Sequence, residues 1–153
     1  MACLEQIPEP MRSVIAGLEC PNFKTQPWME GPPLSRRRVA IVSTAGLHHR
    51  DDRPFSIMSD EYRIIPGDIK MNDLVMSHTS TNFDRTGFQQ DWNVVFPLDR
   101  LRELSDQGII GSVADFHYSF MGATDPKLME ATARGLASLL KKDQVDAILL
   151  IPV

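Results

Sequence analysis

Apolar residues along this chain recur in short runs bounded by turn residues, which is the pattern of strands. The run Val39 to Val42 is β-branched and ends in the small residues 43–46, so it predicts a buried first strand followed by a turn. Residues 62–65 and 74–77 predict two further strands, because turn-forming pairs such as Pro66-Gly67 bound them. Residues 109–120 predict a fourth strand region.

Helical spacing separates these runs in the second half of the chain. Pro97 suits the first turn of a helix, and leucines at 98, 101 and 104 then share one face until Gly108. Asp125-Pro126 predicts the N-cap and first position of a second helix, and Lys141-Lys142 suits its C-terminal end. Strands that alternate with helices predict an α/β fold with a mostly parallel sheet flanked by helices.

The last segment, residues 145–151, is almost continuously aliphatic. Such a run is typical of a strand covered on both faces of a parallel sheet, and it also fits a terminal edge strand. A covered strand at this position would need a further helix and loop beyond Val153. We therefore expect the α/β domain, residues 35–153, to be incomplete at its C-terminus, as in a truncated product.

Residues 1–34 differ from the rest because they hold six of the eleven prolines. Proline favours extended and turn conformations, so this segment is interpreted as an N-terminal arm. Within it, apolar residues at positions 11, 14, 15 and 18 predict one short amphipathic helix that packs on the body or on a partner.

Composition excludes several classes of protein. With 153 residues and 16 basic against 20 acidic side chains, the chain has a net charge of -4, which argues against broad nucleic-acid binding. No apolar stretch is long enough for a membrane span or signal peptide. The two cysteines, Cys3 and Cys20, form no metal or disulfide motif. We expect a cytoplasmic protein with no metal.

Histidines and a polar loop are the candidates for chemistry. His48, His78 and His117 fall near predicted strand ends, where α/β sheets bind ligands. His117 fits a buried strand histidine as well as a site residue. His78 opens a polar run through Asp84 and Arg85, which fits a binding loop or a turn that bonds its own backbone.

Asp84, Arg85 and Asp91 lie in one connection. They either pair with each other to fix the loop or bind the charged ends of a small zwitterion. The glycines at 108, 111 and 122 lack the spacing of a phosphate-binding loop and are interpreted as turn residues.

One block, residues 87–101 (GFQQDWNVVFPLDRL), resembles the selenoprotein B family of glycine, sarcosine, betaine and D-proline reductases. Residues 39–48, 78–84, 108–111 and 117–122 are similar to it as well, so the resemblance spans about three quarters of the chain, from residue 37 to residue 153. It implies a cytosolic reductase component that cleaves a carbon–nitrogen bond of a small amino acid derivative, with electrons from a thiol reductant or partner reductase subunit.

For the site, we predict catalytic roles for His78, His117 and Asp84, because a histidine with its usual pKa near 7 could donate a proton to a leaving amine. We predict substrate contacts for Ser43, Thr44, His48, Arg85 and Asp91. The resemblance also implies a selenocysteine or cysteine just after Val153, which this chain does not contain. The alternative from another functional class is a non-catalytic binding or assembly subunit of a redox complex, and either protein could form a homo-oligomer.

Overall fold

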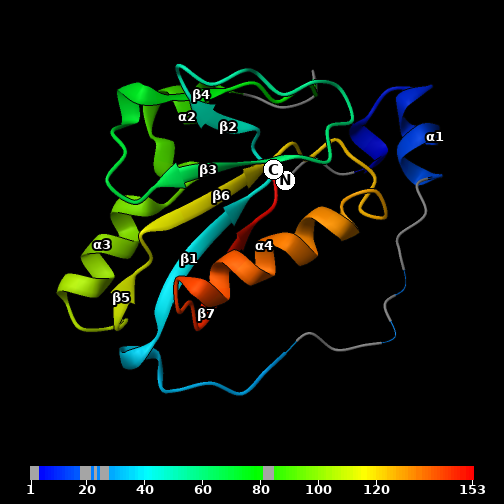
Figure 1. Cartoon of the computed structure of the whole chain (residues 1–153). Helices are drawn as coiled ribbons and strands as arrows, with labels where there is room; N and C mark the ends of the chain where they lie inside the picture. Colours follow the sequence, from blue (N-terminus) through cyan, green and yellow to red (C-terminus); the bar gives the residue numbers. More distant parts are fainter. Residues whose placement is uncertain (1–3, 18–21, 23, 25–27, 81–84) are drawn as a thin grey trace.

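A five-stranded sheet with β1 (Arg38–Ser43) at its centre forms the body of the protein (Figure 1). The computed structural model describes residues 4–17, 22, 24, 28–80 and 85–153. Parallel to β1 lie β5 (Ser112–Val113) and β6 (Phe116–Phe120) on one side and β7 (Ala147–Ile151) on the other. On the far side of β6, β3 (Tyr62–Pro66) runs antiparallel. The sheet is therefore mostly parallel, as the sequence predicts.

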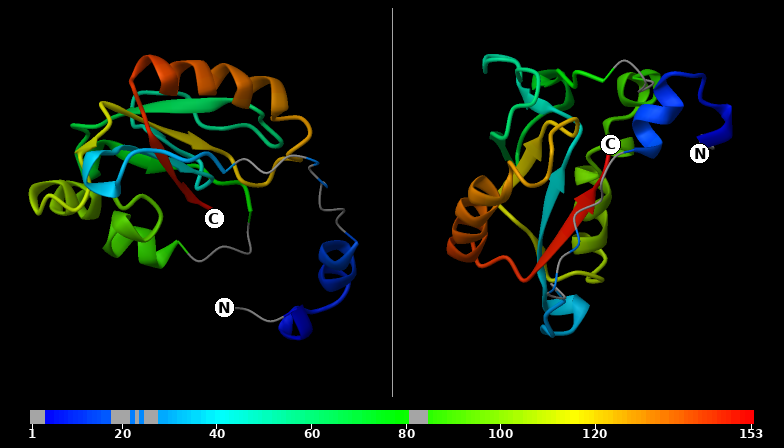
Figure 2. Two further views of the ribbon diagram at one scale, coloured as in Figure 1. Left: turned by 90° about the horizontal axis from the view of Figure 1, so that it is seen from below. Right: turned by 90° about the vertical axis from the view of Figure 1, so that its right-hand side faces the viewer.

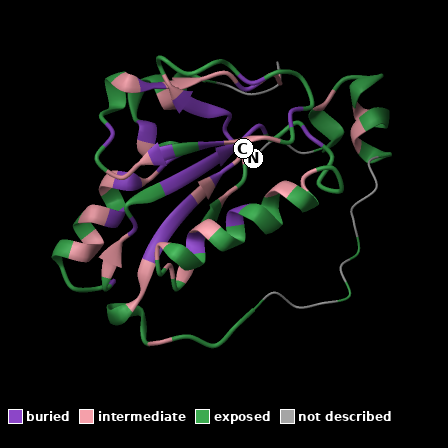
Figure 3. Ribbon diagram, viewed as in Figure 1, coloured by how far each residue is buried: buried purple, intermediate pink, exposed green. Residues whose placement is uncertain are grey.

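Helices cover both faces of this sheet because successive side chains of β1 point in opposite directions. Val39 and Ile41 pack in the cluster that contains Leu98 and Leu101 of α3 (Leu98–Asp106). On the opposite face, Ala40 packs in the cluster of Leu136 and Leu140 of α4 (Glu130–Lys142). Each fully buried leucine contributes about 1.5–3 kcal/mol, so the two helices fix the sheet between them. Figure 3 shows β1 and β6 as the most continuously buried strands.

A second sheet, of two strands, lies beside the carboxyl ends of the parallel strands. It pairs β2 (Leu47–His49) with β4 (Leu74–Met76), which comes after the 3-10 turn Met71–Asp73. The Leu47 amide donates to Ser119 Oγ at 2.9 Å, which ties β2 to β6. After β4 come α2 (Thr86–Gln90) and the 3-10 turn Trp92–Val94.

The described residues of the N-terminal arm include the 3-10 turn Leu4–Gln6 and the short helix α1 (Met11–Ala16), and a further 3-10 turn, Leu34–Arg36, begins at the last residue of the arm. The helix confirms the sequence prediction except at Leu18, which lies outside the described residues. None of its residues is buried, and Figure 2 shows it set apart from the sheet. Among the described residues, no helix is long and apolar enough to cross a membrane.

The predicted strand region 109–120 contains two strands, β5 and β6, with a break at Ala114–Asp115. The Ala114 amide still donates to Val39 of β1 at 2.9 Å, whereas the Asp115 carbonyl turns toward β3 and accepts from Gly67 at 2.7 Å. The two residues thus bond to opposite neighbours, which separates β5 from β6.

The predicted start of α4 at Asp125-Pro126 is also wrong. Asp125 instead forms a local turn, in which its carboxylate accepts from the Lys127 amide at 2.9 Å and its carbonyl accepts from Leu128 at 3.0 Å. The helix begins only at Glu130, after Met129.

Residues 145–151 include the strand β7. In the described part of the chain β7 has β1 on one side and no strand on the other. Ile148, Leu149 and Leu150 are 46%, 37% and 68% exposed. Within the described residues its aliphatic side chains are therefore only partly covered.

Candidate functional site

The carboxyl ends of β1, β6 and β7 meet at one edge of the sheet, where loops of α/β proteins commonly bind ligands. Thr44, directly after β1, joins all three ends. Its amide donates to Ile151 at 3.0 Å, its Oγ1 accepts from the Val153 amide at 2.8 Å, and its carbonyl accepts from the Gly122 amide at 2.8 Å. The sequence-predicted residue Thr44 thus lies at the centre of the strand-end cluster, defined here as Thr44, His78, Gly122 and Val153.

His78 reaches this cluster from β4 because Gly46 lets the two backbones pack closely. Gly46 has a φ of +66°, and a Cβ there would lie 2.9 Å from the backbone nitrogen of His78. Its carbonyl accepts from the Ser77 amide at 2.9 Å. A larger residue at 46 would push His78 away from the strand ends.

The His78 ring lies against Gly122, the second residue after β6. A Cβ on Gly122 would be 3.1 Å from His78 Nε2, 2.8 Å from the Thr44 carbonyl and 2.6 Å from the Val153 carbonyl. Gly122 was interpreted from the sequence as a turn glycine. Its position just after a strand end was the available signal for a site role, but the neighbours that crowd it are remote in sequence.

One hydrogen bond determines which nitrogen of the neutral His78 ring carries the proton. The Ser80 amide donates to Nδ1 at 3.1 Å, so Nδ1 carries a lone pair and the proton of the neutral ring lies on Nε2. Burial lowers the pKa of His78, and the positive charge of Arg85 lowers it further. At neutral pH the ring therefore presents a neutral Nε2–H to the strand-end cluster.

Arg85 stands beside this histidine. Its guanidinium donates to the His78 carbonyl and, at 3.5 Å, to the Ser80 carbonyl. The sequence prediction that Arg85 belongs with His78 agrees with this arrangement. Asp84, the third predicted member of the loop, lies outside the described residues.

Met121 is a neighbour that the sequence did not single out. Its fully buried thioether sulfur accepts from Thr79 Oγ1 at 3.2 Å and from the Ala123 amide at 3.3 Å. It thereby connects the segment after β4 to the segment after β6. Thioether sulfur is a weak acceptor, so the contact contributes to shape more than to energy.

His117 lies in the core, away from this edge. The Ile41 amide of β1 donates to its Nδ1 at 3.0 Å, and its ring packs edge-on against Phe96. Burial lowers the pKa of His117 to about 4. The geometry matches the strand-histidine interpretation, with a side chain bonding an amide of the sheet.

Three further predicted residues form hydrogen bonds to the protein backbone through their side chains. Ser43 Oγ donates to the Val95 carbonyl at 2.9 Å and is fully buried. His48 is 3% exposed, and its Nδ1 lies 2.8 Å from the His49 carbonyl. Asp91 caps the 3-10 turn after it by accepting from the Asn93 amide at 2.9 Å, and the bonds from Asn93 lower its pKa.

The block 87–101 that carries the resemblance forms a hydrogen-bonded turn rather than an open pocket. Trp92 Nε1 donates to Asp99 Oδ2 at 2.6 Å, and the Asp99 amide donates to Asn93 Oδ1 at 3.1 Å. Arg102 continues the network from Asp99 to the Gly67 carbonyl at 2.6 Å. These bonds anchor the start of α3.

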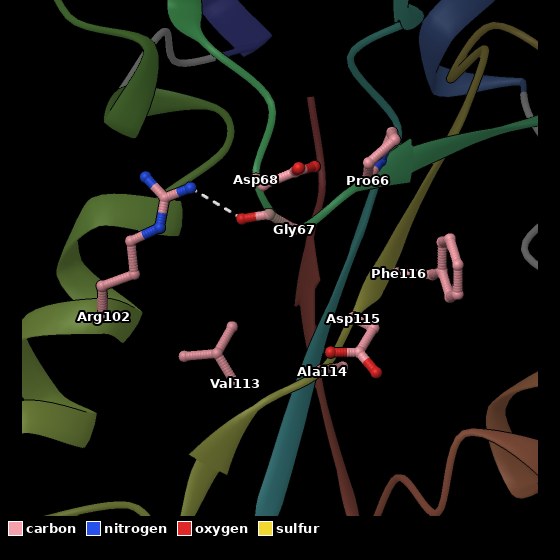
Figure 4. Close-up of a pocket in the computed structure, with 8 residues that line it drawn as sticks. All are labelled: Pro66, Gly67, Asp68, Arg102, Val113, Ala114, Asp115 and Phe116. Carbon is pink, nitrogen blue, oxygen red and sulfur yellow. Dashed lines mark hydrogen bonds between the residues drawn. The ribbon is translucent and has the colours of Figure 1, made fainter.

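A pocket of about 510 Å³ lies at the opposite, amino end of the parallel strands (Figure 4). Arg102, Asp68 and Phe116 are among its lining residues. A smaller cavity of about 310 Å³ adjoins it at Phe116, beside α4. Neither contains His78 or Thr44. In the described residues no group of three His, Cys, Asp or Glu side chains is arranged to hold a metal ion.

Sequence comparison identifies the family. A profile of the glycine/sarcosine/betaine reductase selenoprotein B family matches residues 18–152. The chain belongs to this selenoprotein B family. It is 37% identical over 120 residues to D-proline reductase subunit gamma of Acetoanaerobium sticklandii, an alignment covering 76% of this chain and 49% of that protein.

Two further relatives share lower identity with the chain. Identity is 32% over 140 residues to glycine reductase complex component B subunit gamma of Symbiobacterium thermophilum, covering 85% of this chain and 32% of that protein. It is 30% over 125 residues to sarcosine reductase complex component B subunit beta of Peptoclostridium acidaminophilum, covering 76% and 28%. The chain thus spans half or less of the curated relatives it matches. No solved structure matched.

Proposed function

We propose that this chain forms the scaffold and substrate-side part of a cytoplasmic selenoprotein B-type reductase component that cleaves a carbon–nitrogen bond of a small amino acid derivative. The observation that carries the proposal is the strand-end cluster, in which His78 faces the end of β7 in a chain of this family. Its relatives are named as subunits of reductases for D-proline, glycine and sarcosine.

The redox group is proposed to lie outside residues 1–153, as a selenocysteine or cysteine that comes after β7. The sequence offers only Cys3 and Cys20 within the chain, both in the N-terminal arm. A selenol or thiol at that place would supply the nucleophile and receive electrons from a thiol reductant or partner subunit. The alignments cover 49%, 32% and 28% of the curated relatives, so those proteins have room for such a segment.

The residues present have defined parts in this proposal. Thr44 holds the backbone of Val153 through Oγ1, which orients the segment that leaves β7. His78 offers Nε2–H to an acceptor atom of the substrate or nucleophile. Asp84 is retained as an untested member of the same loop. His117, with a pKa of about 4, is neutral at pH 7 and stabilises the sheet.

A second candidate is a non-catalytic binding or assembly subunit. The exposed aliphatic side chains of β7 favour it, because an unprotected edge strand can pair with another chain.

The codon directly after Val153 in the message discriminates between the two candidates. A UGA codon with an open frame that encodes a further α/β unit favours the reductase component. A UAA or UAG stop, or UGA without such a frame, would leave the assembly subunit.

The activity test uses the complete form of the protein, with cysteine at any selenocysteine position, plus a dithiol and its partner subunits. Carbon–nitrogen cleavage is the expected result, seen as ring opening of D-proline or as amine release from glycine, sarcosine or betaine. His78→Ala should lower turnover roughly 10²-fold, at the low end of the effects of removing one hydrogen-bond donor from an active site. His49→Ala is the control, since its side chain is 43% exposed and outside the strand-end cluster. Equal turnover in both variants would remove His78 from the site.

A further inference from the structure

The surroundings of His78 restrict what its ring can do. A protonated imidazole carries hydrogen on both nitrogens, and it could not accept the bond that the Ser80 amide makes to Nδ1. The ring is only 5% exposed, so water offers little compensation for its charge. His78 in this geometry is a hydrogen-bond donor through Nε2 and a poor site for a positive charge.

Backbone oxygens lie near Nε2. The atoms nearest a Cβ built on Gly122 are the oxygens of Thr44 and Val153 together with Nε2 itself.

Arg85 is the residue that maintains this arrangement from outside the ring. Its guanidinium bonds the carbonyls of residues 78 and 80, which are the two ends of the turn that brings the Ser80 amide to Nδ1. Among the described residues it is also the charged group whose field acts on the ring. One side chain therefore stabilises both the turn and the neutral state.

We propose that Arg85 is a positioning residue that holds His78 as a neutral ring with its proton on Nε2. The hydrogen bonds from Arg85 to both ends of the turn, and from the Ser80 amide to Nδ1, carry this inference. It rests on the proposed function for the place of His78 in the site.

The test of Arg85 is nuclear magnetic resonance of the complete form of the protein, with ¹⁵N-labelled histidine observed from pH 5 to 8. Wild-type His78 should show the Nε2–H tautomer and a titration midpoint below the ordinary histidine value of 6.5. Arg85→Gln should raise the midpoint and mix the tautomers. Arg85→Lys keeps the charge but loses the planar guanidinium whose Nη2 bonds both carbonyls, so the midpoint should stay low while the tautomers mix.

Arg134→Gln is the matched control, because Arg134 is 78% exposed on α4 and should leave the His78 signals unchanged. Backbone amide spectra report whether each variant is folded. An unchanged tautomer and midpoint in folded Arg85→Gln would overturn the positioning role. Failure of the proposed function is separate, since it shows as no carbon–nitrogen cleavage by the complete protein while these signals behave as expected.

The neutral state of His78 has its own measurement in the complete protein. Turnover should not fall as the pH rises from 6 to 8 on account of His78, because the neutral ring is the active form. Arg85→Gln should lower turnover about tenfold with wild-type thermal stability, and Arg85→Lys should recover part of it. A rate that falls with the deprotonation of His78 would mean that the imidazolium is required, and would overturn the donor assignment.

Discussion

His78 and His117 make the same local contact in two different regions of the molecule. In each ring Nδ1 accepts from a backbone amide, at 3.1 and 3.0 Å, and in each burial lowers the pKa. The amide on His78 comes from Ser80, two residues away, whereas the amide on His117 comes from Ile41 on the central strand, 76 residues away. The same kind of hydrogen bond therefore stabilises a local turn at His78 and connects two strands of the sheet at His117.

Because of this difference, we expect substitution of His117 to lower mainly the stability of the protein and substitution of His78 to lower mainly its activity. Near the break between β5 and β6, the His117 ring accepts the hydrogen bond that a strand carbonyl would otherwise accept. Its removal therefore leaves the buried Ile41 amide of β1 without a partner. His78 lies at the sheet edge, where removal changes the strand-end cluster and leaves the ladder of β1 intact. Substitutions in the two regions test this separation, from the largest expected effect to the smallest.

His117→Ala should have the largest effect on stability. It creates a cavity beside Phe96 and leaves the Ile41 amide unpaired, which together cost about 4 kcal/mol. For a domain of this size that corresponds to a fall in melting temperature of roughly 10–15 °C. Thermal unfolding measures it, and His49→Ala should shift the midpoint by no more than about 2 °C. A similar small shift for both would place His117 outside the structural core.

Acidification should destabilise the protein through the same residue. The pKa of His117 is about 4 in the fold against 6.5 when unperturbed, so the unfolded chain takes up the proton first. This contribution is fully present above pH 6.5 and is lost as the pH falls toward 4, amounting to roughly 3 kcal/mol. Chemical unfolding between pH 7 and 4 measures the slope.

His117→Gln is the control for the acid effect. Glutamine can accept from the Ile41 amide but does not titrate, so its stability should fall less steeply over this range. An equally steep fall in the variant would assign the acid sensitivity to other groups.

Gly122→Ala tests the packing of the strand-end cluster. The added Cβ would lie 2.6 Å from the Val153 carbonyl and 2.8 Å from the Thr44 carbonyl, so the backbone must shift at a cost of about 1–3 kcal/mol. Gly135→Ala is the control, because nothing lies within 4 Å of a Cβ there in α4. It should stabilise the protein by about 0.5–1 kcal/mol. Equal midpoints for the two variants would show that Gly122 is not closely packed.

The sequence predicted elements whose signal is local and left out features that depend on remote partners. Val39 to Val42, residues 62–65 and the leucines of α3 carry their own periodicity, and the structure confirms all three. β2 was not predicted because its three residues, Leu47–His49, are too short to show alternation. Pro97 also differs in detail, since it is the N-cap of α3 rather than a residue of its first turn.

The candidate site was predictable in part for the same reason. Thr44 and His78 both come after strand ends, which was a local signal, but His78 follows β4 of the antiparallel β2–β4 pair, so their meeting depends on how the two sheets pack. The roles of Gly122, Met121 and the Ser80 amide depend on contacts across the fold, and no spacing in the sequence shows them. An aliphatic run such as β7 is equally ambiguous, because burial depends on which strands lie beside it.

His78→Ala should cost far less stability than His117→Ala, at about 1 kcal/mol, because its amide partner Ser80 can bond to water once the ring is gone. The melting temperature should fall by roughly 2–4 °C, while turnover of the complete protein should fall roughly 10²-fold through loss of a hydrogen-bond donor. Thermal unfolding and carbon–nitrogen cleavage are measured on the same preparation. A loss of stability as large as that of His117→Ala would abolish the contrast between the two histidines.

Deletion of residues 1–10 should have the smallest effect. The described residues of this segment, 4–10, include none that is buried, and α1 beyond them is likewise without a buried residue. Removing the segment loses little apolar burial, so the free energy of unfolding should change by about a few tenths of a kcal/mol. Thermal unfolding of the shortened chain measures this change. A fall in melting temperature of more than about 8 °C corresponds to well over 1 kcal/mol for this domain, and it would mean that the arm packs against the sheet and that the strand-end cluster is not independent of it.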